Sequence, residues 1–171
     1  MGKKSTKENK NIYQISREEL ELTRDKASEL MQYISADRIE KIESEKSLPH
    51  PDEILIMADC YKKPNLPNYY CSHVCPIGRE YVPEIELKDL SQIVLEMLGT
   101  LNAVEKQKNR FIDITMDGEI TADEFKDFIS IQSTLNKISL VVDSLHLWIE
   151  DSIARGTIDK AAWERKRKLS D

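Results

Sequence analysis

Three potential metal ligands stand close together in the sequence. Cys71, His73 and Cys75 lie within five residues of one another, and thiolate and imidazole are ligands that zinc prefers. Cys60 can supply a fourth ligand, so the segment predicts a zinc site as one alternative. An iron–sulfur or redox role, or simply buried or incidental thiols, are the others, because known zinc sites mostly space paired ligands by two residues and add a second pair farther along the chain.

A second segment, residues 113–124, has the spacing of a calcium-binding loop. Oxygen-bearing side chains occupy its first, third and fifth positions, a glycine the sixth and a glutamate the twelfth. The segment resembles an EF-hand loop over these twelve residues only. The candidate ligands are Asp113, Thr115, Asp117, Glu119 and Glu124. A competing interpretation needs no metal, because Asp117 and Gly118 can form a turn and Thr121 with Glu124 can form a capping box.

No catalytic constellation is evident in the sequence. The chain contains three histidines, His50, His73 and His146, and it has neither a glycine-rich phosphate-binding loop nor a Gly-x-Ser-x-Gly nucleophile elbow. We therefore expect a protein that is not an enzyme and requires no cofactor, with zinc or calcium as the metals its residues allow.

Composition and charge narrow the class of protein. The 171 residues are 33% charged and 6% aromatic, which is typical of a helical chain of one or two small domains. The formal net charge of −6 argues against a protein that coats nucleic acid or an anionic membrane. No apolar run approaches the roughly 20 residues that span a bilayer, and the N-terminus has no signal-peptide core. We expect a cytoplasmic protein without a membrane partner.

Helix caps and apolar spacing organise the N-terminal third of the chain. Thr23 and Ser35 can each cap a helix, and Ile39 and Ile42 would face inward from a helix over about 36–45. The proline pair around His50 ends that segment, and Asp52 begins a further helix.

These features resemble the lambda-repressor-like, or XRE-type, helix-turn-helix family over about residues 15–66. The matching residues are Leu22, Thr23, Ala27, Ile34, Ser35, Ile39, Ile42, Glu43, Pro49 and the run from Ile54 to Ala58. The resemblance implies a helix that reads double-stranded DNA. The residues expected at the DNA are Arg24, Ser35, Ala36, Asp37, Arg38, Lys41 and Lys46. The turn between the paired helices usually contains glycine, whereas Met31, Gln32 and Tyr33 stand here, so we expect a longer or helical turn.

The charge of this segment leaves a second function open. Residues 11–66 contain eight basic and twelve acidic side chains, a net charge of −4, although phosphate neutralisation supplies most nonspecific DNA affinity. The basic residues 1–11 are expected to be disordered, either as an arm that follows a DNA groove or as a solubilising tail. The alternative to a DNA-binding regulator is a repressor-like fold that binds a protein, for example as an inhibitor of a nucleic-acid enzyme.

Apolar periodicity predicts two long helices in the rest of the chain. On the first, over about 86–112, the recurring positions are Leu87, Leu90, Val94, Leu98 or Met97, Leu101 and Val104. On the second they are Phe125, Phe128, Gln132, Leu135, Ile138, Val142, Leu145 and Ile149. Two such helices joined by a short turn form an antiparallel hairpin. A terminal helix over about 159–169 carries the basic run 165–168.

An isolated hairpin needs further apolar cover, so we expect either a homodimer formed mainly through residues 86–155 or an intramolecular core completed by Trp148 and Trp163.

The predicted fold is therefore all-α, an N-terminal helix-turn-helix bundle joined to a C-terminal long antiparallel helical hairpin. Its expected parts are a disordered basic tail over 1–11, a helix-turn-helix domain over 12–66, a linker with cysteine and proline over 67–84, and a hairpin for interaction and dimerisation over 85–171. The expected function is sequence-specific DNA binding by a transcriptional regulator of phage or mobile-element type.

Overall fold

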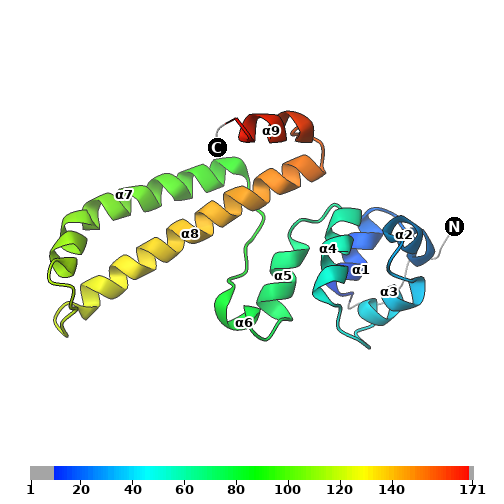
Figure 1. Ribbon diagram of the computed structural model, residues 1–171, viewed down its shortest axis with the longest axis horizontal. Helices are drawn as coiled ribbons and strands as arrows, with labels where there is room; N and C mark the ends of the chain where they lie inside the picture. Colours follow the sequence, from blue (N-terminus) through cyan, green and yellow to red (C-terminus); the bar gives the residue numbers. More distant parts are fainter. Residues whose placement is uncertain (1–9, 170–171) are drawn as a thin grey trace. The chain divides into compact units, whose positions relative to one another are not determined.

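The computed structural model describes residues 10–169, so the basic tail expected over 1–11 lies almost entirely outside the described residues. Over the described range the fold is all-α, as the sequence predicted, with nine helices and no strands (Figure 1). The chain divides into two compact units. One contains the residues up to Glu84 together with those from Glu150 onward, and the other runs from Ile85 to Ile149.

Four short helices open the first unit, and caps explain where three of them begin. They are α1 (Ile12–Glu19), α2 (Arg24–Met31), α3 (Ala36–Glu43) and α4 (Pro51–Cys60). The side chains of Asn11, Thr23 and Ser35 each accept a hydrogen bond from a backbone N–H in the first turn of the helix that follows. The caps predicted at Thr23 and Ser35 are therefore confirmed. Helix α4 begins with Pro51, whose missing N–H is not needed at that position.

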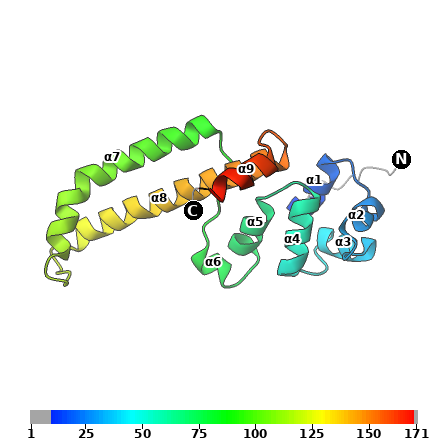
Figure 2. The same cartoon turned by 45° about the horizontal axis from the view of Figure 1, so that its top comes forward.

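One apolar core joins these helices. Ala27 of α2, Ile39 of α3 and Met57 of α4 are fully buried, and Figure 2 shows α3 and α4 beside α2. The remaining buried core residues are Tyr13, Met31, Ile34, Ile42, Ile54, Tyr61 and Leu66. Each large apolar side chain that leaves water here contributes roughly 1.5–3 kcal/mol. The core therefore fixes which face of α3 turns inward.

The segment expected to be a linker forms two more helices, α5 (Leu66–His73) and α6 (Gly78–Tyr81). Leu66 is fully buried in the core, and the Tyr69 ring packs edge-to-face against Tyr13 at 6.3 Å between ring centroids. Glycine is required at position 78, because a Cβ atom there would lie 2.1 Å from the carbonyl oxygen of Cys71. The helices thus continue well beyond residue 66.

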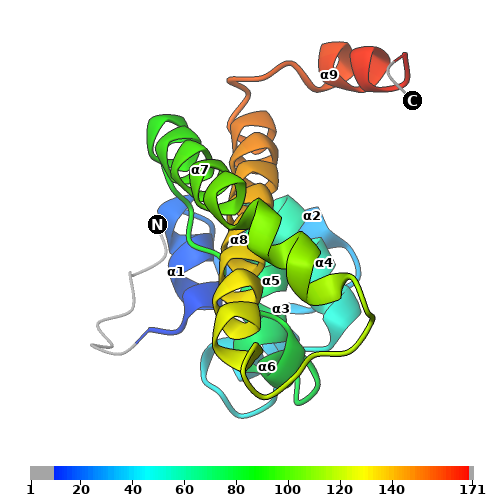
Figure 3. The same cartoon turned by 90° about the vertical axis from the view of Figure 1, so that its left-hand side faces the viewer.

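The two long helices predicted from periodicity are α7 (Leu90–Thr115) and α8 (Phe125–Ala154), followed by α9 (Lys160–Arg167). Within residues 85–149, α7 and α8 run side by side in opposite directions (Figures 1, 2 and 3). Gln107 bonds Ser130 at 3.1 Å, and Arg110 pairs with Asp127 at 2.7 Å. The antiparallel hairpin was therefore predicted correctly, although α7 starts after Asp89 rather than at residue 86.

The turn between α2 and α3 is short, so the expectation of a longer or helical turn was wrong. It spans residues 32–35, and Gln32 adopts a φ of 62° with a ψ of −30°. An L side chain rarely takes this backbone conformation because its Cβ crowds the backbone. The chain keeps the tight turn at the expense of local strain.

We expect Gln32→Gly to raise the free energy of unfolding by about 0.5–1 kcal/mol, because glycine adopts a positive φ without the Cβ conflict. Gln32→Ala is the matched control and should give no gain, since alanine retains the Cβ. Urea denaturation of the three proteins measures the difference. A glycine variant no more stable than the alanine variant would contradict the strained turn.

Candidate nucleic-acid interface

The outer face of α3 is the candidate interface. Ile39 and Ile42 lie in the core, so Asp37 and Lys41 are left on the opposite, exposed side of the helix. Ser35 caps the start of α3 through a 3.2 Å hydrogen bond from the Arg38 backbone N–H. The helix therefore presents its first turn and one side.

A buried ion network holds α3 in place. The Glu43 carboxylate is 1% exposed and accepts hydrogen bonds from Arg17 Nε at 2.6 Å and Arg17 Nη2 at 2.9 Å. Arg24 Nε donates to the same carboxylate at 2.8 Å. Arg24, expected at the DNA, is thus committed through this nitrogen to joining α2 to α3. Removing one partner of such a network leaves a buried charge unpaired and costs about 3–5 kcal/mol.

Arg38 was also expected at the DNA, but its guanidinium is held within the protein. Its Nε and Nη2 atoms each lie 2.7 Å from a different Glu53 carboxylate oxygen. Nη1 donates to Ser47 Oγ at 2.6 Å and Nη2 also donates to the Leu48 carbonyl at 2.9 Å. Glu53 in turn accepts the His50 N–H at 2.7 Å and so caps α4. Arg38 therefore joins α3 to the start of α4, and this bidentate pair leaves it poorly placed to contact DNA.

The two remaining predicted cations form weaker pairs at the surface. Lys41 Nζ lies 2.7 Å from Asp37 on the next turn of α3, and Lys46 Nζ lies 3.0 Å from Glu40. Such exposed ion pairs contribute about 0–1 kcal/mol, so a phosphate can replace the carboxylate. Lys26, which sequence reasoning passed over, is an exposed cation in the first turn of α2, and no ion pair of its side chain is recorded within residues 10–169.

The candidate zinc ligands are not brought together. The His73 ring stacks on Tyr69 with 4.3 Å between ring centroids, and its Nδ1 lies 2.9 Å from Ser72 Oγ. Cys75 Sγ accepts the Gly78 N–H at 3.5 Å. Cys71 and His73 are two residues apart on α5, which turns their side chains about 200° from each other. Within residues 10–169 no cluster of three or more Cys, His, Asp or Glu side chains is arranged to hold a metal ion.

The candidate calcium ligands take part in local hydrogen bonds instead. Asp113 and Thr115 belong to α7, and the Thr115 hydroxyl donates to the Phe111 and Ile112 carbonyls. Asp117 Oδ1 accepts the Glu119 N–H at 3.1 Å. Glu124 Oε2 accepts the N–H and the hydroxyl of Thr121. These contacts match the interpretation as a turn and a capping arrangement.

Comparison of the chain with protein-family models, with curated proteins and with solved structures gave no match. None of the helices described between residues 10 and 169 is long and apolar enough to cross a membrane.

We expect Arg38→Ala to lower the free energy of unfolding by about 1–3 kcal/mol, because it removes both charge-assisted hydrogen bonds to Glu53. Lys41→Ala is the comparison on the same helix and should change it by less than about 0.5 kcal/mol, since it removes an exposed pair. Urea denaturation at neutral pH measures both. Equal effects of the two substitutions would show that Arg38 has no special structural role.

The same pair predicts a pH dependence. Hydrogen bonds from the Arg38 guanidinium lower the pKa of the Glu53 carboxyl in the folded protein. A lowered folded-state pKa stabilises the fold above the unfolded-state value of about 4.3, and this stabilisation is lost as the pH falls through the folded-state pKa. The stability difference between the wild type and Glu53→Gln should therefore shrink in acid. A difference that is the same at neutral and acid pH would contradict it.

Proposed function

We propose that the α2–turn–α3 module binds duplex DNA and that the protein acts as a transcriptional regulator. The observation that carries the proposal is the placement of α3. Its apolar side is fixed in the core by Ile39 and Ile42, and its first turn, capped by Ser35, is exposed. In helix-turn-helix proteins the N-terminal residues of the second helix contact base edges in the major groove. Ala36 and Asp37 hold the corresponding positions here.

The contacts assign different roles to the cations around α3. Lys41 and Lys46 belong to exposed pairs that can open toward phosphate, and Lys26 is exposed beside them in sequence on α2. Arg24 and Arg38 position the helices instead, through Glu43 and Glu53. With so few available lysines, the module should make few phosphate contacts and show a shallow salt dependence.

A second function, binding of a protein, is favoured by the charges on the same face. Asp37 and Glu40 alternate with lysines along α3, and the segment 11–66 carries a net charge of −4. Charge patterns of mixed sign direct protein partners through electrostatic complementarity. An inhibitor of a nucleic-acid enzyme could use this surface without contacting DNA.

Neutral substitutions on α3 separate the two functions. Asp37→Asn with Glu40→Gln releases Lys41 and Lys46 from their carboxylates, so we expect tighter binding to random duplex DNA, by about tenfold at low salt. Lys41→Gln with Lys46→Gln should weaken binding and reduce the slope of log affinity against log salt by about 2. Fluorescence anisotropy of the full chain across a salt series measures both.

The control for these measurements is Lys62→Gln, which removes a lysine of an exposed pair with Asp59 outside α2 and α3. It should leave the affinity and the salt slope nearly unchanged. If the folded wild type and the Asp37→Asn, Glu40→Gln variant both fail to bind duplex DNA at low salt, the regulator is rejected and the protein-binding function remains.

A further inference from the structure

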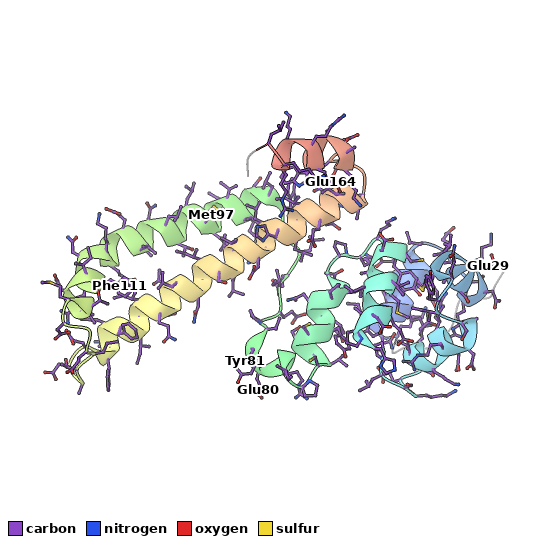
Figure 4. The ribbon with its side chains drawn as sticks, in the orientation of Figure 1. Glu29, Glu80, Tyr81, Met97, Phe111 and Glu164 are labelled. Carbon is purple, nitrogen blue, oxygen red and sulfur yellow. The ribbon has the colours of Figure 1, made fainter. Side chains whose placement is uncertain are left out.

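The unit from Ile85 to Ile149 buries little of its apolar surface. Ile93 and Ile114 are the α7 side chains that are fully buried, and Met97 and Phe111, labelled in Figure 4, are half-buried. A second set of large apolar side chains on α7 is 40–80% exposed: Leu90, Val94, Leu98, Leu101, Ile112 and Met116. Small units need a well-covered core to be stable, so an exposed set of this size calls for a covering surface.

The exposed side chains form a single stripe along α7. Leu90, Val94, Leu98 and Leu101 follow one another at steps of four, four and three residues, which keeps them on one side of a helix. The stripe is turned by about 100° from the buried side chain of Ile93, because successive helical residues are separated by that angle. It is therefore distinct from the side of α7 that carries the buried residues.

Two charged residues continue the stripe between its apolar ends. Glu105 stands four residues after Leu101, and Lys108 stands four residues before Ile112. Both side chains are more than half exposed, and they form a 2.6 Å ion pair on the helix surface. The stripe thus reads as apolar, acidic, basic and apolar in order along α7.

We propose that this stripe, from Leu90 to Met116, is a self-association surface on which a second copy of the chain packs antiparallel. A two-fold axis that crosses α7 between Glu105 and Lys108 sets Glu105 against Lys108 of the second copy, and the reverse. It also sets Leu101 against Ile112 of the second copy. In any parallel arrangement in register, like charges meet instead, so the charge order selects the antiparallel pair. The inference does not depend on DNA binding.

The area is sufficient for a stable pair. Full burial of an apolar side chain removes roughly 60–120 Å² from water at the usual transfer free energy, so the six half-exposed side chains offer roughly 300 Å² per chain. Two copies therefore bury about 600 Å² of apolar surface, which corresponds to about 1,000 Å² in total at the apolar fraction typical of homodimer interfaces. Specific interfaces begin at about this size.

Ile120 and Phe125, both exposed, follow α7 closely in sequence. In the antiparallel pair they lie toward the Leu90 and Val94 end of the second copy and add to the area.

Charge reversal tests the arrangement. Glu105→Lys gives a chain with two lysines in the stripe, and Lys108→Glu gives a chain with two glutamates. Each variant alone places like charges at both contacts, so we expect its dimer to be about tenfold weaker than that of the wild type. An equimolar mixture of the two variants restores opposite charges at both contacts, and a heterodimer should form. Sedimentation equilibrium of the full-length chains, over a range of micromolar concentrations, measures all three.

The mixture separates contacts between chains from contacts within one helix, because each variant breaks the Glu105–Lys108 pair within its own chain and mixing cannot restore it. A monomeric wild type at high micromolar concentration would overturn the proposal and would mean that another partner, or the chain itself, covers the stripe. Charge-reversed variants that dimerise as tightly as the wild type, or a mixture no tighter than either alone, would overturn it as well.

An apolar substitution locates the surface independently of charge. Leu101→Glu, in the stripe, should weaken the dimer at least about tenfold. Leu95→Glu is the matched control, since Leu95 is 70% exposed on the same helix but lies off the stripe, and it should leave the dimer intact. A dimer equally sensitive to both substitutions, or to neither, would place the interface elsewhere. Circular dichroism of each variant checks that the helices are retained.

Discussion

The buried carboxylate of Glu43 is the constraint on which the first unit depends. Its two oxygens receive hydrogen bonds from Arg17 and Arg24, so one side chain of α3 is tied to α1 and α2 at once. A buried carboxylate is tolerated only when its charge is balanced and its lone pairs are used. The network therefore fixes the rotation of α3 as firmly as the apolar contacts of Ile39 and Ile42 do, and with it the face that remains exposed.

The same requirement for paired charges decides what that face can bind. Arg38 is placed on α3 where a DNA contact would be expected, but Glu53 and the chain around Leu48 occupy its guanidinium. The remaining lysines are paired only at the surface, where ion pairs exchange easily. A module built in this way has a rigid scaffold and a weakly charged contact face. Specific contacts, rather than general attraction to phosphate, would have to supply most of its DNA affinity.

The second unit presents the opposite situation, with apolar side chains in excess of the surface that covers them. Helix α7 carries apolar residues in two directions, one containing Ile93 and Ile114 and one containing the stripe from Leu90 to Met116. One neighbouring helix can cover only one side of a helix. The charged residues Glu105 and Lys108 within the stripe limit the ways in which two copies can fit together.

The sequence by itself determined the features that depend on near neighbours along the chain. Helix caps at Thr23 and Ser35 and the long helices α7 and α8 follow from contacts over three or four residues, which spacing reveals. The helical character of residues 66–81 was missed, because prolines and cysteines there read as a linker although Leu66 completes a core assembled from four other helices. Burial of that kind cannot be read from local spacing.

Tertiary structure alone decided which candidate residues are available for binding. The partner of Arg38 lies fifteen residues away on α4, and that of Arg24 nineteen residues away on α3, so only the folded core brings each pair together. The cysteine–histidine segment and the calcium-like loop show the same limit in reverse. Their residues are close in sequence, but Cys71 and His73 on α5, like Asp113 and Thr115 on α7, are two positions apart on a helix, where side chains diverge.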